Sequence, residues 1–227
     1  AVSAAAADAG RRLAERVLGA IGWLPPDRES HVAAALRDQL LWHAVLYGSD
    51  PAGESAGRAF QDLRQGRSLH PDLLKAALQA GALLYDAQAL DWMIDRLGRT
   101  TSEHERLAIM AALGCFREPS TLAAARDFAL DNVPPRNRFM PLVAMAANPY
   151  AVADLWPWFV SSRDRFKDFH PLLFERVIAA LVPVAGLVDP AAVRAFCQGY
   201  AEANPQFKSV VALSLEKLEI NLRFREG

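Results

Sequence analysis

The segment SEHER at residues 102–106 holds the residue types that come nearest to catalytic chemistry in this sequence. In a helical HExxH motif, two histidines one turn apart bind zinc and the glutamate acts as a general base. Here the position of the second histidine is Ala108. The spacing matches a capping box instead, in which the Ser102 side chain accepts a hydrogen bond from the helix and Glu105 reaches back to the Ser102 N–H. We therefore predict a helix start here and no zinc site.

The histidines and cysteines show no catalytic pattern either. No two of the five histidines stand three or four residues apart, the spacing that metal ligands on a helix often have. They are His31, His43, His70, His104 and His170. His43 continues the apolar spacing of Leu40 and Tyr47, so we interpret it as a buried, hydrogen-bonded residue. Cys115 and Cys197 have no partner nearby in the sequence that would lower the thiol pKa. The sequence thus predicts neither a catalytic residue nor a cofactor in this chain.

Two polar segments remain as candidate ligand sites. Arg136, Asn137 and Arg138 follow two prolines, and at a helix start their side chains and the backbone N–H groups can converge on a carboxylate. We take these three as candidate substrate-binding residues, with solvated surface as the alternative. The second segment, residues 161–168, alternates basic and acidic side chains, so we interpret it as a solvated loop or helix end.

The overall composition excludes several classes of partner. The chain has 227 residues, with 25 Lys and Arg against 26 Asp and Glu, so its net charge of −1 predicts no nucleic-acid partner and no attraction to a membrane surface. Two cysteines are too few for a disulfide scaffold. Residues 1–10 lack the basic start and apolar stretch of a secretory signal, and no uninterrupted apolar run is long enough to span a membrane. We expect a soluble, cytoplasmic protein.

Apolar residues recur at helical spacing along almost the whole chain, which predicts an all-α fold. One apolar stripe steps by four and three residues and is assigned to a single helix. Its members are Leu83, Ala87, Leu90, Ile94 and Leu97. A further stripe, over residues 193–200, includes Cys197 and directs its thiol into a core. About a dozen short helices with tight connections favour an irregular α-solenoid of stacked antiparallel helix pairs, HEAT-like in type. A compact bundle is the alternative.

Proline and glycine mark the ends of these helices. Asp, Asn or His stands before a proline at six points where an apolar run follows, for example Asp50-Pro51 and Asp189-Pro190. A side chain before the proline can cap the helix, and proline suits the first helical position. Several glycines follow apolar runs, where a left-handed residue closes a helix. They are Gly22, Gly48, Gly66, Gly98 and Gly186.

Four stretches of sequence together resemble the C-terminal helical domain of zinc aminopeptidases of the puromycin-sensitive and endoplasmic-reticulum type. They read SEHERLAIMAALGCF, NPYAVADLWPWFVSSRDRF, FERVIAALVPVAG and SLEKLEINLRFRE. The resemblance implies a HEAT-like stack of helix pairs that closes over a catalytic domain, in which the zinc ion lies. The zinc signature of that family is absent from this sequence. Residues 1–227 are therefore expected to form a single helical domain from the C-terminus of a larger aminopeptidase.

Three functions compete at this point. The resemblance favours a non-catalytic lid that encloses the active site, with the parent's own catalytic domain and peptide substrates as its partners. The solenoid architecture alone is also compatible with a free-standing scaffold that binds a protein along its concave face. An independent α-helical enzyme is the least favoured, because no group of residues in the sequence forms a catalytic motif.

Overall fold

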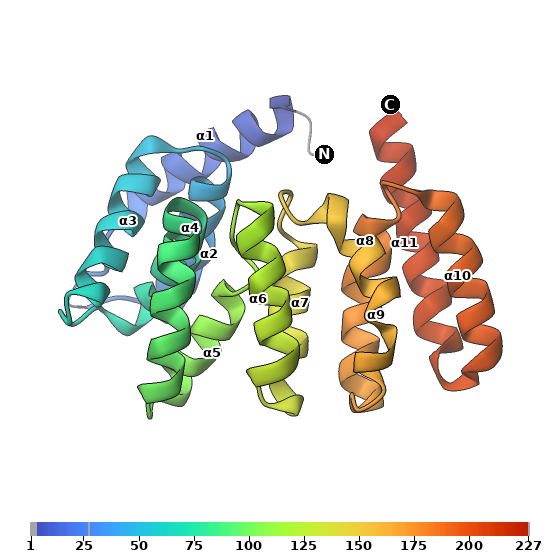
Figure 1. Ribbon diagram of the computed structural model, residues 1–227. Coiled ribbons are helices and arrows are strands. Elements are labelled where there is room, and N and C mark those ends of the chain that lie inside the picture. The colour runs from blue at the N-terminus through green and yellow to red at the C-terminus, as the bar shows by residue number, and fades with distance from the viewer. Residues whose placement is uncertain (1–3, 27, 227) are drawn as a thin grey trace. The chain divides into compact units, whose positions relative to one another are not determined.

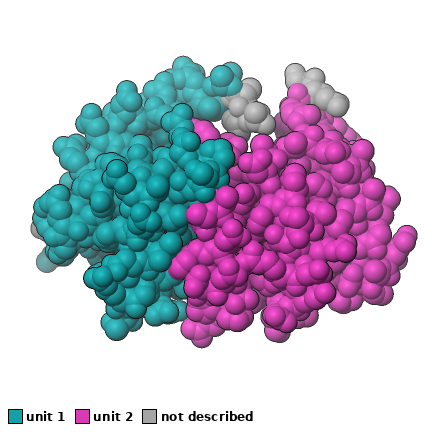
Figure 2. Space-filling model, viewed as in Figure 1, with its two compact units in different colours: residues 1–121 teal, residues 122–227 magenta. Residues whose placement is uncertain are grey.

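The computed structural model describes residues 4–26 and 28–226, and within these ranges it contains helices and no strand (Figure 1). The all-α, solenoid-like architecture expected from the apolar spacing is confirmed. None of the described helices is long and apolar enough to cross a membrane. The chain divides into two compact units, residues 1–121 and residues 122–227 (Figure 2).

The first unit is built around two neighbouring helices, α2 and α4. α2 packs against α1, α3 and α4, while α4 also packs against α3 and α5. The helices are α1 (Ala4–Ile21), α2 (His31–Leu46), α3 (Asp50–Arg64), the 3₁₀ turn η1 (Pro71–Leu73), α4 (Leu74–Arg99) and α5 (Glu103–Ala112). Alanines and leucines with almost no exposed surface form the core between α1, α2, α3 and α4. Small side chains allow these helices to approach closely, so much of the stability of this unit comes from packing.

One close contact in this unit lies between α3 and α4. The ring of Phe60 is fully buried and covers the backbone at Gly81. A Cβ atom at Gly81 would lie within 3.0 Å of three ring atoms of Phe60. Tyr85 stacks on the same ring with a centroid separation of 5.6 Å, and Trp92 meets it edge-on at 5.5 Å. Glycine is therefore required at position 81, because the Phe60 ring leaves no space for a side chain there.

α4 is interrupted in its middle, which corrects the expectation of one continuous helix. Asp86 has φ 40° and ψ −118°, outside the helical region. Its Oδ1 atom accepts hydrogen bonds from the backbone N–H groups of Arg117 and Glu118, each at 2.9 Å. Because the break turns the second half of the helix, Ala87 is exposed. The buried residues after the break are Ala89, Leu90, Met93 and Leu97.

Side-chain caps fix four of the six helix starts that proline marks in the sequence. The expectation was wrong for Asn148, which precedes a turn, and for Asn204, whose side chain makes no cap hydrogen bond. His170 caps α9 (Pro171–Ala185) and Asp189 caps α10 (Pro190–Ala203), with hydrogen bonds from the N–H groups of Leu172 (3.3 Å) and Ala192 (3.0 Å). The prediction for Asp50 was one residue out, because Ser49 is the cap of α3 and Asp50 lies inside the helix. A side chain at either position can reach the free N–H groups of the first turn, and here serine does so.

Three of the five glycines expected to close helices have left-handed backbones: Gly22, Gly48 and Gly66. The expectation was wrong for Gly98, which lies inside α4. Gly186 does close α9 as its C-cap, but with φ −64° instead of a left-handed backbone. At Gly186 a Cβ would come within 3.0 Å of the Leu218 side chain, so glycine provides room there for α11 (Lys208–Glu226).

The second unit is organised around α9, which packs against α7, α8 and α11. α11 also contacts α10, and α9, α10 and α11 lie side by side (Figure 1). The elements are α6 (Pro119–Asn132), whose first three residues belong to the first unit, η2 (Pro135–Asn137), α7 (Phe139–Ala146), α8 (Val152–Ser161), η3 (Arg163–Phe166), α9 (Pro171–Ala185), α10 (Pro190–Ala203), η4 (Pro205–Phe207) and α11 (Lys208–Glu226). Aromatic rings from α8, η3, α9 and α10 fill much of its interior.

Candidate functional site

The SEHER segment forms a helix start, as the sequence predicts. Ser102 caps α5, and its Oγ accepts a hydrogen bond from the Glu105 N–H at 3.3 Å. Glu105 does not reach back to Ser102, which corrects the second half of the capping box. Its carboxylate accepts hydrogen bonds from Arg96 Nε at 2.7 Å and Arg96 Nη2 at 3.0 Å, and a further one from the hydroxyl of Thr100. Glu105 therefore joins α5 to the end of α4. Because its carboxylate is already paired with Arg96, it is not available as a general base.

No group of three or more His, Cys, Asp or Glu residues suited to a metal ion occurs among the described residues. The two thiols are buried, and burial raises the pKa of Cys115 to about 12 and that of Cys197 to about 11. A thiol with such a pKa carries almost no thiolate near neutral pH and is a poor nucleophile or metal ligand. The described part of the chain therefore offers structural cysteines and no fit for a zinc ion.

The structure overturns the expectation for His43 on α2. His43 is exposed, and its Nδ1 lies 2.7 Å from the Gln39 carbonyl oxygen, so the prediction of a buried histidine was wrong. Arg37 is buried instead, with only 1% of its side chain exposed. Its guanidinium pairs with Glu29 and donates to the carbonyl oxygens of Ile21 (2.7 Å) and Gly22 (2.8 Å). Arg37 thereby provides hydrogen-bond donors for the carbonyl groups at the end of α1, which is a structural role.

The three candidate substrate-binding residues lie together in the turn between α6 and α7. Arg136 and Asn137 belong to η2, and Arg138 follows it. Arg136 is exposed, whereas Asn137 is buried. The Nε of Arg138 donates to the carbonyl oxygen of Val133 at 2.9 Å, so this arginine helps to hold the turn. Arg136 is therefore an exposed cation on a turn that the hydrogen bond of Arg138 helps to fix.

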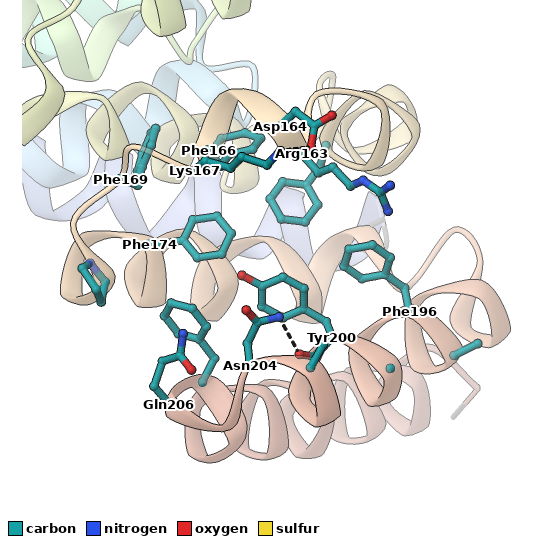
Figure 3. A pocket seen from close by; sticks show the side chains of 16 residues that line it. Arg163, Asp164, Phe166, Lys167, Phe169, Phe174, Phe196, Tyr200, Asn204 and Gln206 are labelled. Carbon is teal, nitrogen blue, oxygen red and sulfur yellow. Dashed lines mark hydrogen bonds and ion pairs between the residues drawn. The ribbon is translucent and has the colours of Figure 1, made fainter.

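A pocket of about 740 Å³ lies elsewhere in the second unit and was not expected from the sequence (Figure 3). Aromatic rings from five helical elements and one loop line it. They are Phe159 of α8, Phe166 of η3, Phe169 of the following loop, Phe174 of α9, Phe196 and Tyr200 of α10 and Phe207 of η4. Five of these rings are at least nine-tenths buried. Their centroids are separated by 5.1 Å for Phe159 and Phe166 and by 5.5 Å for Phe174 and Phe207, the spacing of aromatic rings in contact. We call this the aromatic pocket.

One wall of the aromatic pocket is formed by small residues of α10. Ala195, Gly199 and Ala203 recur every four residues, line the pocket and are exposed. A Cβ atom added at Gly199 would meet no other atom within 4 Å. The wall is therefore open because its side chains are short, and a longer side chain at Gly199 has space to enter the pocket.

Charged and amide side chains surround the opening of the aromatic pocket. Arg163, Asp164 and Lys167 come from the η3 segment, and Asn204 and Gln206 come from the end of α10 and from η4 (Figure 3). Lys167 Nζ lies 2.9 Å from Asp164 Oδ1, and this hydrogen-bonded ion pair lowers the pKa of the Asp164 carboxyl. The segment is a solvated helix end, as its sequence suggested, but it also borders a pocket.

The sequence holds a weak signal for the aromatic pocket. Phe166, Phe169 and Phe174 follow one another closely, and the small residues of α10 stand at helical spacing. Neither pattern differs from that of an ordinary core or helix contact. Only the fold shows that the two patterns face each other across an open space.

These features define a helical, solenoid-like domain with a ligand-sized pocket and no metal-binding group among its described residues. The family model described as ERAP1-like C-terminal domain matches residues 1–220. The chain belongs to this family, and the resemblance seen in the sequence is confirmed.

The curated relatives of the chain are aminopeptidases. Aminopeptidase M1-D of Oryza sativa subsp. japonica is 27% identical over 216 residues, which are 91% of this chain and 24% of the relative. Aminopeptidase M1 of Arabidopsis thaliana is 25% identical over 219 residues, 92% of this chain and 24% of that relative. The chain thus spans about a quarter of the length of these relatives.

Proposed function

We propose that the chain serves as the non-catalytic C-terminal domain of a zinc aminopeptidase, where it closes over the catalytic domain and helps to hold peptide substrates. The observation that carries this proposal is the family match over residues 1–220, together with relatives that are aminopeptidases about four times as long. The zinc ion would lie in the catalytic domain of the parent, a cytoplasmic enzyme. Enclosure of an active site excludes water and limits access, so such a domain would affect which peptides are cleaved more than how the bond is broken.

The turn at Arg136, Asn137 and Arg138 is the proposed peptide contact. The exposed guanidinium of Arg136 would bind a carboxylate of the peptide. The planar N–H donors of arginine can form two parallel hydrogen bonds with a carboxylate. Arg138 would act with Asn137 by keeping the turn in place, because its Nε is bonded to the Val133 carbonyl. The proposed role is positioning of the peptide away from the bond that is cleaved.

The test is kinetic and uses the full-length parent enzyme. The Arg136→Ala variant and the Arg136→Ala/Arg138→Ala variant are expected to raise KM for long peptides while leaving short substrates unchanged. Arg223→Ala, which removes an exposed arginine from α11, is the matched control. Unchanged kinetics for every peptide length would overturn the role of this turn.

The size of the native protein separates the lid from a free-standing scaffold. An antibody raised against the chain should detect a protein several times larger than 24.8 kDa. A native band at 24.8 kDa would favour the protein-interaction scaffold instead.

A further inference from the structure

The aromatic pocket has the size of a small-molecule site. Such sites have volumes of about 300–1,000 Å³, and this open pocket has a volume of about 740 Å³. A single amino-acid side chain would fill only a fraction of that space. Five of the lining rings are already at least nine-tenths buried, so the ring surface open to a ligand is that of the partly exposed Phe196 and Tyr200. The part of a ligand that lies on these ring faces is apolar.

The opening of the aromatic pocket favours one negative charge on the ligand. Two cations, Arg163 and Lys167, stand there against one anion, Asp164. Asp164 is already paired with Lys167 at 2.9 Å, so the local excess charge is positive. Arg163 extends along the side of the opening on which Phe196 lies (Figure 3). A guanidinium in this position can bind a carboxylate through two parallel hydrogen bonds.

We infer that the aromatic pocket binds a small amphipathic carboxylate, a molecule with an aryl or alkyl body and a single carboxylate group. Its body lies on the rings of Phe196 and Tyr200 and along the wall of Ala195, Gly199 and Ala203. Its carboxylate stays at the opening beside Arg163. This site is distinct from the turn at Arg136 and does not depend on the proposed role in an aminopeptidase.

The test is a titration of the 227-residue chain with 4-phenylbutyrate, followed by saturation-transfer NMR. The uncharged 4-phenylbutanol is the matched probe for the carboxylate. N-acetyl-glycyl-glycine, which has a terminal carboxylate but no aryl or alkyl body, is the probe for a peptide end. We expect 4-phenylbutyrate to bind about fivefold more tightly than the alcohol, since an exposed ion pair contributes up to about 1 kcal/mol. Equal affinity for acid and alcohol, binding of the peptide probe alone, or no binding of the acid at about 10 mM would each overturn the inference.

Two variants locate the site. Gly199→Leu fills the pocket from a position with free space, so it should weaken binding of both acid and alcohol by about tenfold or more. The same substitution at Gly98, which also lies in a helix with no atom within 4 Å of the added Cβ, is the matched control and should leave binding unchanged. Arg163→Ala should reduce the affinity for the acid to that for the alcohol. Binding that survives Gly199→Leu would place the ligand elsewhere and overturn the assignment.

Discussion

Phe60 and Gly81 are in direct contact, with the phenyl ring of α3 occupying the space that a side chain on α4 would need. The contact allows two helices of the first unit to approach more closely than side chains on both would permit. Tyr85 and Trp92 pack against the same ring. Position 81 therefore decides the packing of a whole group of aromatic residues.

Gly81→Ala is expected to destabilise the first unit. Overpacking costs about 1–3 kcal/mol, and the better helix propensity of alanine returns up to about 1 kcal/mol, so we expect a net loss of about 1–2 kcal/mol. Urea unfolding followed by tryptophan fluorescence measures it, because Trp92 contacts Phe60. Gly98→Ala has free space at the same kind of helical position and should be neutral or stabilising. Equal stability of the two variants would contradict the packing argument.

Asp86→Ala should also destabilise the first unit. The substitution removes the acceptor for the N–H groups of Arg117 and Glu118. The net contribution of each such hydrogen bond is about 0.5–1.5 kcal/mol. Asp86→Asn keeps an acceptor oxygen on a side chain of the same shape, so it should retain most of the stability in thermal unfolding. If the two variants unfold alike, the side-chain bonds of Asp86 do not matter.

The ion pair of Glu105 predicts an acid-dependent loss of stability. Burial alone would raise the pKa of this carboxyl, but the hydrogen bonds from Arg96 and Thr100 outweigh it, and the pKa lies below its ordinary value of 4.5. A carboxyl whose pKa is lowered by folding stabilises the protein above its unfolded pKa, and this contribution disappears as the pH falls through the folded pKa.

The stability advantage of the wild type over Glu105→Gln should therefore shrink as the pH falls from about 7 to about 3. Urea unfolding at a series of pH values measures the difference. Asp164→Asn is a useful control, because it removes a carboxylate of the exposed pair with Lys167. A difference between wild type and Glu105→Gln that stays constant with pH would exclude the proposed contribution.

Both thiols should resist alkylation in the folded protein. The pKa of about 12 for Cys115 and of about 11 for Cys197 leaves almost no thiolate at about pH 8. Mass spectrometry after treatment with iodoacetamide should find no adduct under native conditions and two after denaturation. Rapid labelling of either cysteine in the folded chain would show that its burial is not persistent.

Local features of the fold were readable from the sequence, because a cap or an apolar stripe depends on neighbouring residues. Ser102 and Asp189 cap the helices that the sequence marks. The break at Asp86 was not readable, since its carboxylate is fixed by N–H groups about thirty residues away in the chain. The aromatic pocket was missed for the same reason.

The face of α2 illustrates a second limit. The stripe of Leu40, His43 and Tyr47 has helical spacing, yet the core side of the helix carries Arg37 and Leu41. A buried arginine looks like a surface residue in a sequence. Its partners, Glu29 and two carbonyl groups of the α1 end, become visible only when the chain is folded.

The volume of the aromatic pocket depends on the short side chains of Ala195, Gly199 and Ala203, whereas the folding of the protein depends on other residues. Substitutions at these exposed positions of α10 can shorten or close the cavity, whereas the buried phenylalanines opposite them cannot change without loss of core packing. The size of the cavity can therefore be changed through three exposed positions, while the buried scaffold that bears them stays the same.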